Sequence, residues 1–277
     1  MSKMDNSNND PTNWDDPANF DPMYEKRPGK TTIQIFRDAY GSDYPEEVEP
    51  HSFITKTDLT CITHWLGIGP GDVLVDLGCG SGGPGLWLAR ETGANLIGVD
   101  FSPKAIEQAN QHIADFGLVG RARFLVGNLC ETGLPESSCD GAMSIDVLMF
   151  LPDIAAAMKE ISRILKPGAR LVFTAIEGRN AVIYRLPLQN NGFDVEIYEE
   201  KPNWRSRVLV LYERAIAEQA AIIEESGDSG RVLIDEAKAF LPDGLVNTRH
   251  VIVVGKKVSE KGKETPRNHK VMREAVR

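Results

Sequence analysis

Hydrophobic and polar positions alternate along the middle of the chain in blocks that predict strands followed by helices. Short apolar runs rich in β-branched residues predict buried strands at 73–75, 95–99, 123–126, 139–145 and 171–176. Between them, apolar residues recur at spacings of three and four, which predicts helices at about 83–92, 103–117 and 154–165. Strands and helices that alternate at this length are typical of a largely parallel sheet with right-handed crossovers.

The last third of the chain is less regular. We expect a sixth strand at 193–198, one long helix at 205–225, a shorter helix at 232–240 and a final strand at 250–254. The expected fold is α/β: a Rossmann-like, mostly parallel sheet of seven strands with helices on both faces. An N-terminal helical arm and a helical insertion before the last strand would complete it.

The N-terminal region lacks the strand pattern. Residues 1–30 are rich in Asn, Asp, Pro and Ser without apolar periodicity, so we expect a disordered leader. Apolar spacing then predicts one helix that ends at Gly41 and a second that begins at Thr57, capped by its hydroxyl, and ends at Gly67. The expected division is a leader at 1–30, a helical cap at 31–67, a main domain at 68–258 with a substrate-side insertion at about 200–247, and a charged tail at 259–277.

Composition narrows the classes of function. The chain has 277 residues and a formal net charge of −9, which is poorly suited to holding nucleic acid through phosphate contacts. No apolar run approaches the roughly twenty residues of a membrane span. The four cysteines form no C-x-x-C pair, so we expect reduced thiols and no metal site. We therefore expect a cytoplasmic protein without nucleic-acid or membrane partners, and a homodimer is left open.

One glycine-rich stretch, V-L-V-D-L-G-C-G-S-G-G-P-G-L-W at 73–87, has the order strand, glycine turn, helix. This order is typical of a nucleotide site over a helix N-terminus. Gly78, Gly80 and Gly83 match the dinucleotide fingerprint, with Asp100 about twenty residues further on. Asp76 does not fit that reading, because a carboxylate just before the glycines would repel a pyrophosphate. It suits a cationic ligand such as an ammonium group.

The motifs at 73–85, L-I-G-V-D-F-S at 96–102, G-L-P-E-S-S-C-D at 133–140, L-P-D-I at 151–154 and L-K-P-G-A-R-L at 165–171 resemble the class I S-adenosylmethionine-dependent methyltransferases. The resemblance is strongest to the small-molecule branch that contains ubiquinone, sterol and natural-product enzymes. It implies S-adenosyl-L-methionine as cofactor and a small-molecule acceptor. The implied cofactor-binding residues are Asp76, Gly78, Gly80, Gly82, Asp100, Phe101, Asn128, Leu129 and Ile145.

Within that resemblance, each position has an implied role. The three glycines would let the backbone pass close to the methionine part, and Asp76 would support the loop and the amino group. Asp100 would accept both ribose hydroxyls, whereas Phe101 would pack on the adenine and Asn128 would face its amino group. Ile145 and Asp146 would lie beside the sulfonium and the acceptor.

A general base is required only if the acceptor carries a proton of high pKa. Phe150 stands where many relatives have a histidine, so one common base is absent. His51 is the candidate that remains, with a lid or packing role as the alternative, and Asp146 and Glu177 are rival bases. The remaining histidines are interpreted as surface residues (His64, His112 and His269) or as structural (His250).

The leading hypothesis is methyl transfer to oxygen, nitrogen or carbon of a small metabolite, as in secondary metabolism. The alternative from another class is a protein that keeps the fold as a binding or cyclisation scaffold without methylating. A dehydrogenase is disfavoured by Asp76. A nucleic-acid methyltransferase is disfavoured by the acidic balance and by Leu148-Met149-Phe150 after the fourth strand.

Overall fold

A computed structural model describes residues 19–48, 52–241 and 243–258 of the chain. Its centre is one seven-stranded sheet in the order β3-β2-β1-β4-β5-β7-β6. The first five strands pair in parallel, and β7 runs antiparallel to both of its neighbours. The strands are β1 (Val73–Leu77), β2 (Asn95–Asp100), β3 (Ala122–Val126), β4 (Cys139–Ile145), β5 (Leu165–Gly178), β6 (Phe193–Glu200) and β7 (Thr248–Lys257). The predicted α/β architecture is confirmed.

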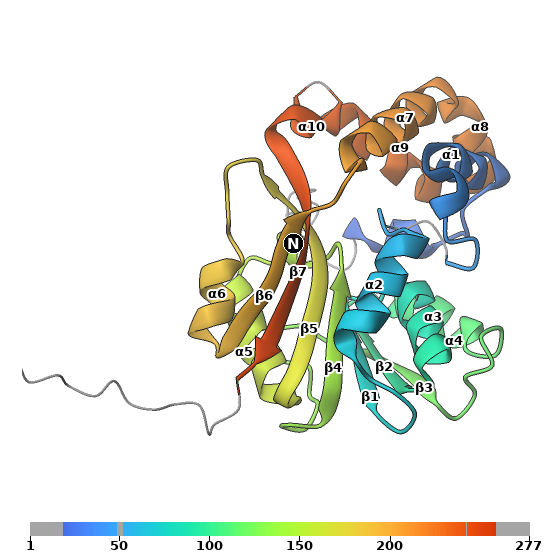
Figure 1. Ribbon diagram of the computed structural model, residues 1–277. Coiled ribbons are helices and arrows are strands. Elements are labelled where there is room, and N and C mark those ends of the chain that lie inside the picture. The colour runs from blue at the N-terminus through green and yellow to red at the C-terminus, as the bar shows by residue number, and fades with distance from the viewer. Residues whose placement is uncertain (1–18, 49–51, 242, 259–277) are drawn as a thin grey trace, which may run out of the picture.

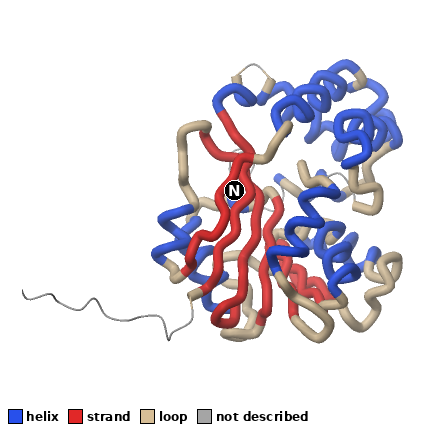
Figure 2. The backbone as a smooth tube through the Cα atoms, in the orientation of Figure 1, coloured by secondary structure: helices blue, strands red, loops and turns tan. Residues whose placement is uncertain are grey.

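Helices cover both faces of the sheet, and a further layer of helices lies beyond one end of its strands (Figures 1 and 2). The helices are α1 (Lys30–Tyr40), α2 (Lys56–Leu66), α3 (Gly83–Thr92), α4 (Pro103–His112), α5 (Ile154–Ile164), α6 (Arg185–Asn190), α7 (Trp204–Ala217), α8 (Gln219–Ser226), α9 (Asp228–Phe240) and α10 (Gly244–Asn247). Within the described part of the chain, no helix is long and apolar enough to cross a membrane.

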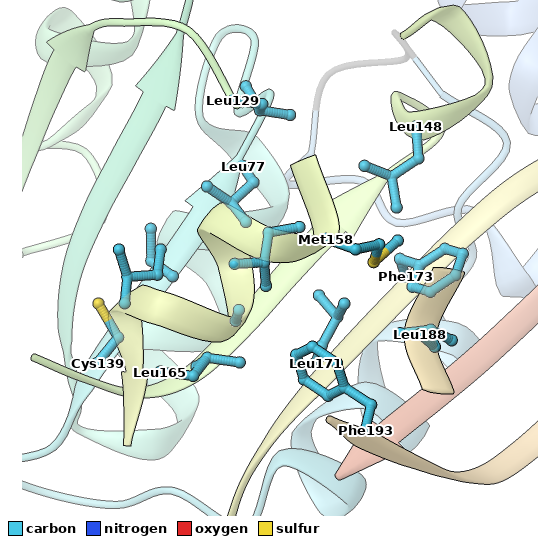
Figure 3. Packing of buried hydrophobic residues seen from close by; sticks show 14 of the residues in the cluster. Leu77, Leu129, Cys139, Leu148, Met158, Leu165, Leu171, Phe173, Leu188 and Phe193 are labelled. Carbon is cyan, nitrogen blue, oxygen red and sulfur yellow. The ribbon is translucent and has the colours of Figure 1, made fainter. Parts of the chain in front are cut away.

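Two hydrophobic clusters hold the helices against the sheet. One cluster joins α5 and α6 to one face, and Figure 3 shows Met158 of α5 beside Phe173 of β5. The other cluster joins α2, α3 and α4 to the opposite face. A fully buried side chain of this size contributes about 1.5–3 kcal/mol, so these two interfaces fix the position of the strand ends.

A third cluster joins α1 to the helices that follow β6. Ile35 and Phe36 of α1 pack with Leu211 of α7 and Ile234 of α9. These helices lie beyond the strand ends toward which β1 and β4 run (Figure 1). The helical layer therefore combines the segment before the sheet with the segment inserted before its last strand.

The ends of several elements differ from the sequence prediction. The cap of α2 is Thr55, whose hydroxyl accepts a hydrogen bond from the Asp58 N–H while the Asp58 carboxylate accepts one from the Thr55 N–H. Thr57 is not the cap, because its hydroxyl instead donates to Asp43. The helix predicted at 103–117 ends at His112.

Three other boundaries are corrected in the second half of the chain. The single helix expected at 205–225 is divided at Glu218, which lies between α7 and α8. β5 begins at Leu165, so the Pro-Gly pair at 167–168 lies within it, at a register shift against β4. The final strand is longer than expected at both ends.

Part of the predicted leader is described and packed. A short 3-10 helix, η2 (Asp21–Tyr24), lies against α4 and α9. The Ser229 hydroxyl of α9 donates to the Pro22 carbonyl at 2.6 Å, and the Gln108 side chain of α4 donates to the Tyr24 carbonyl at 2.5 Å. This segment therefore bridges the sheet-covering helices and the helical layer.

Candidate functional site

The turn between β1 and α3 carries three glycines in backbone conformations that other residues rarely adopt. The φ angles are 74° at Gly78, 51° at Gly80 and 84° at Gly82. The Gly78 and Cys79 amides both donate to the Val99 carbonyl, which ties the turn to β2. These hydrogen bonds fix the backbone of the turn just before the N-terminus of α3.

Asp76 lies at the end of β1, directly below this turn, and is 2% exposed. Its carboxylate accepts a hydrogen bond from the Gly85 N–H, but no described residue is a hydrogen-bond partner of its Oδ2. Burial, assisted by the charge of Asp100, raises the pKa of Asp76 to about 8. An unsatisfied buried oxygen of this kind fits a ligand that brings its own donor or positive charge.

Asp100 stands at the end of the neighbouring strand β2. Its Oδ2 accepts the Gly80 N–H and its Oδ1 accepts the Ser102 N–H, each at 2.9 Å. Burial raises the pKa of Asp100, and these backbone hydrogen bonds oppose the rise. Each carboxylate oxygen keeps a further lone pair, which leaves acceptor capacity for a pair of ligand hydroxyls.

Aromatic residues of the N-terminal segment cover the turn. The Tyr24 hydroxyl lies 2.8 Å from where a Cβ on Gly80 would stand. The Phe20 ring lies edge-on to Phe101 at 5.3 Å and to Phe150 at 5.7 Å between centroids. The sequence prediction missed Tyr24 and Phe20 because they fall in a polar stretch without periodicity.

The other predicted cofactor residues follow the neighbouring strands. The Gly127 N–H, after β3, donates to the Asp100 carbonyl, which places Asn128 and the buried Leu129 next to that strand end. The Asn128 side-chain oxygen accepts the Cys130 N–H at 2.7 Å, so it stabilises its own turn. Ile145 is buried at the end of β4.

Asp146 follows β4 with a φ of 56°, a strained conformation for a residue with a Cβ. Its Oδ2 accepts the Phe53 N–H at 2.9 Å, and its Oδ1 accepts the Thr174 hydroxyl at 2.6 Å. Burial alone would raise the pKa of Asp146, but His250, Lys201 and the Thr174 hydroxyl hold it well below its usual range. The carboxylate is therefore ionised.

His250, expected to be only structural, is the partner of Asp146. Its Nε2 lies 2.6 Å from Asp146 Oδ1, the ring is fully buried, and Nδ1 has no hydrogen-bond partner in the part of the chain that the structure describes. Burial lowers the pKa of His250 despite the adjacent carboxylate. His250 opens the strand predicted at 250–254, but only the structure shows that this strand is antiparallel to β5, which brings His250 to the ends of the parallel strands.

Lys201 holds the segment before α2 against this pair. Its ammonium donates to the Phe53 carbonyl at 2.9 Å and pairs with Asp58 at 2.7 Å, although the Lys201 side chain is only 6% exposed. Phe53, whose N–H donates to Asp146, is therefore also held through its carbonyl.

Two candidate bases remain, His51 and Glu177, together with the other histidines of the sequence prediction. His51 lies outside the described residues. Glu177 is held by ordinary structural bonds, since its carboxylate pairs with Arg249 and accepts the Tyr198 hydroxyl at 2.6 Å. His64 is exposed as predicted, whereas the surface prediction for His112 is wrong: it is 6% exposed, with Nδ1 3.0 Å from the Ser81 carbonyl. The described residues contain no group of three or more metal-binding side chains.

Comparison with known proteins assigns the central part of the chain. Residues 75–173 match the family model described as a methyltransferase domain. Over these residues the chain is similar to a methyltransferase domain. The match covers β1 to β5, which includes the turn, Asp76, Asp100 and Asp146.

Known relatives match part of the chain. The chain is 35% identical over 116 residues to methyltransferase phqN of Penicillium fellutanum, which covers 42% of this chain and 36% of that protein. It is 30% identical over 138 residues to the sterol 24-C-methyltransferase erg6 of Aspergillus fumigatus, covering 50% and 35% of the two chains. The match thus spans little more than a third of the length of either relative.

Among solved structures, the fold is similar to the [4+2]-cyclase SpnF, with a TM-score of 0.66 at 20% identity. That superposition covers 82% of this chain and 93% of SpnF. At this identity the likeness shows the fold alone. The superposition extends beyond residues 75–173, because the share of this chain that it covers is larger than those residues make up.

Proposed function

We propose that this protein transfers the methyl group of S-adenosylmethionine to a small-molecule acceptor by in-line displacement. The observation that carries the proposal is the buried Oδ2 of Asp76, which has no hydrogen-bond partner among the described residues and lies beneath a three-glycine turn. The methyltransferase domain of residues 75–173 supports the same conclusion. Both relatives named above are methyltransferases.

The chain offers a partner for each part of this cofactor. Asp76 would bind its ammonium, and the backbone at Gly78, Gly80 and Gly82 would pass close to its methionine chain. Asp100 would accept the ribose hydroxyls. Phe101, Asn128, Leu129 and Ile145 would surround the adenine and the sulfonium side. The cofactor supplies a methyl group already activated by its sulfonium, so the protein mainly aligns the acceptor and excludes water.

The helical layer would form the acceptor side. We assign the cap at 31–67 and the insertion at about 200–247 to this role, because they pack together beyond the strand ends. A sterol methyltransferase among the relatives supports a small and largely apolar acceptor. The cytoplasmic location, the homodimer and the absence of nucleic-acid and membrane partners stay predictions.

Calorimetry with S-adenosylmethionine tests the cofactor assignment. We expect micromolar binding by the unaltered protein and a loss of about 100-fold in Asp100→Ala, because a charged acceptor of two hydroxyls is removed. Asp115→Ala is the matched control, since Asp115 is exposed beyond the end of α4. Absence of binding, or equal affinity in Asp100→Ala, would contradict the proposal.

A cyclisation scaffold is the second candidate, and the likeness to SpnF is the observation in its favour. The two functions differ in the fate of the methyl group. Incubation with S-adenosylmethionine labelled in the methyl group, followed by mass spectrometry of metabolite mixtures, separates them. Label in an acceptor supports transfer, whereas label that stays in the donor while an acceptor is converted supports cyclisation.

A further inference from the structure

Among residues 19–48, 52–241 and 243–258, three buried polar atoms close to one aromatic cluster find no hydrogen-bond partner: His250 Nδ1, the Trp204 indole Nε1 and the Tyr40 hydroxyl. Trp204 and Tyr40 belong to one hydrophobic cluster with Phe53. The His250 ring borders this cluster, 5.7 Å from the Trp204 ring and 6.0 Å from the Phe53 ring between centroids. Buried polar groups are normally satisfied, so three together indicate a ligand site.

The hydrogen bond to Asp146 determines which ring nitrogen of His250 carries the proton. Asp146 is ionised and can only accept, so Nε2 must donate to it. In the neutral ring, Nδ1 is then an unprotonated acceptor. The dyad thus presents a basic nitrogen to the hydrophobic cluster.

The Asp146–His250 pair lies at the strand ends that also carry the glycine turn. β1 and β4 are neighbours, with Asp76 beside Met143 in the parallel register. Gly78 packs directly on the Val147 side chain, where a Cβ would come within 2.5 Å of it. The glycine turn therefore touches the residue that follows Asp146.

The polar atoms and charges indicate the chemistry of the acceptor. A hydroxyl both donates and accepts, so it can bind Nδ1 with its proton and the Trp204 N–H with its oxygen. The acidic groups Asp146 and Glu236 disfavour an anionic acceptor, and burial raises the pKa of Glu236 to about 6, so it is ionised at neutral pH. The cations Lys201 and Arg207 are each paired with an aspartate.

The surrounding surface is aromatic. Phe53 and Tyr212 meet edge to face with centroids 6.3 Å apart, and Tyr212 is fixed by its hydrogen bond of 2.7 Å to Glu236. The Tyr40 ring is stacked on Phe36 at 5.9 Å. An acceptor bound beside His250 would therefore meet aromatic side chains, which attract another aromatic ring.

We propose that His250, positioned by Asp146, is the general base of the methyl transfer and that the acceptor is a neutral phenolic hydroxyl. The inference rests on the proposed function. The hydroxyl oxygen forms a bond to the methyl carbon, the sulfur–carbon bond breaks, and its electron pair stays on sulfur in S-adenosylhomocysteine. The hydroxyl proton passes to Nδ1, and Asp146 stabilises the resulting imidazolium.

Nitrogen NMR of protein labelled with ¹⁵N in the histidine rings tests the base directly. The probe is 4-methylphenol, added to the protein saturated with S-adenosylhomocysteine, and p-xylene is the matched control without a hydroxyl. We expect the His250 Nδ1 signal of an unprotonated nitrogen, shifted by 4-methylphenol and not by p-xylene. A protonated Nδ1, or a signal that 4-methylphenol leaves unchanged, overturns the inference.

Kinetics of His250→Gln provides the second readout, because glutamine can still donate to Asp146 but has no basic nitrogen. We expect labelled methyl transfer to 4-methylphenol to fall at least 100-fold while S-adenosylmethionine affinity stays within about twofold. His64→Gln, at an exposed position, is the control and should match the unaltered protein. Wild-type transfer by His250→Gln overturns the assignment of the base.

The two proposals fail in different ways. If S-adenosylmethionine does not bind, the proposed function itself is wrong. If it binds normally but 4-methylphenol leaves the His250 Nδ1 signal unchanged, only the assignment of His250 as the base is wrong. The NMR measurement uses the unaltered protein, so it decides the question even if His250→Gln does not fold.

Discussion

The two halves of the candidate site are built in different ways. The cofactor cradle, defined as Asp76, the turn 78–82 and Asp100, comes from one continuous stretch of the chain. Backbone amides of its turn hold it together by donating hydrogen bonds to the neighbouring strand. The acceptor layer, defined as Tyr40, Phe53, Asp146, Trp204 and His250, comes from five separate parts of the chain. It is held together by a side chain: the Asp146 carboxylate accepts hydrogen bonds from a backbone amide, a hydroxyl and an imidazole.

This difference matches the reach of the family resemblance. The match to the methyltransferase domain spans 75–173, which includes the whole cradle. Of the acceptor layer, only Asp146 lies inside it. A cofactor that does not change can be bound by a fixed local geometry, whereas an acceptor site assembled from distant segments can change without disturbing the cradle. Under the proposed assignments, Asp146 is where the part that binds the cofactor meets the part that binds the acceptor.

The largest expected effect is on the acceptor layer, through Lys201. Lys201→Met removes the ammonium that pairs with Asp58 and binds the Phe53 carbonyl, leaving a carboxylate only 13% exposed without its counter-charge. We expect a loss of about 3–5 kcal/mol in the free energy of unfolding, measured by urea denaturation. The cradle should keep its cofactor affinity below the transition.

Lys104→Met is the matched control, because Lys104 pairs with Glu25 at the exposed surface. A surface pair contributes little, so no measurable change in stability is expected. Equal stability of both variants would show that the segment before α2 is not fixed by Lys201, and the contrast between the two halves would weaken.

The second effect is on the cradle, through Gly85. An alanine there would place its Cβ 2.5 Å from Asp76 Oδ2, the atom proposed to meet the cofactor ammonium. We expect Gly85→Ala to lower S-adenosylmethionine affinity by about 100-fold in calorimetry, roughly 2.7 kcal/mol. The same change removes a helical glycine, which by itself stabilises a helix by up to about 1 kcal/mol.

Gly69→Ala is the matched control for an added methyl group, since a Cβ at Gly69 meets nothing within 4 Å. It should bind the cofactor like the unaltered protein. If Gly85→Ala also binds normally, Asp76 has room to move, and the cradle is less rigid than its hydrogen bonds indicate.

The same contrast explains what the sequence could predict. The strands and the cradle depend on neighbours in the chain: β-branched runs, a glycine turn and a strand-end carboxylate, each readable within about ten residues. The same holds for the N-caps of α4 and α5, Ser102 and Asp153, whose residue types are those preferred at this position. Thr55 was missed because the competing Thr57 is equally suited to cap a helix by residue type.

The acceptor layer could not be predicted in this way. Nothing near His250 in the sequence shows that Asp146 will lie 2.6 Å away, because that contact joins residues 104 positions apart. Lys201 resembles any surface lysine until the fold buries it. Tyr24 lies in a segment whose composition predicts disorder, and only its tertiary contacts with α4 and α9 order it.

The smallest effect, and the sharpest test of the cradle, is the pH dependence of cofactor binding. Asp76 has a pKa of about 8, so its carboxyl is protonated at pH 6–7 and must lose that proton to meet an ammonium. Affinity should therefore rise up to tenfold per pH unit from pH 6 toward 8. Above pH 8 the rise should stop, because the carboxyl is already ionised and an α-amino group begins to lose its own proton.

Calorimetry at pH 6.5 in buffers of different ionisation enthalpy measures the same step as a released proton. We expect nearly one proton per cofactor bound, and none in Asp76→Asn, which keeps the shape of the side chain but cannot ionise. Release that persists in Asp76→Asn would assign the proton to another group. A flat affinity between pH 6 and 8 without release would mean that Asp76 is ionised before the cofactor arrives, and the cradle would then attract its ligand by charge from the start.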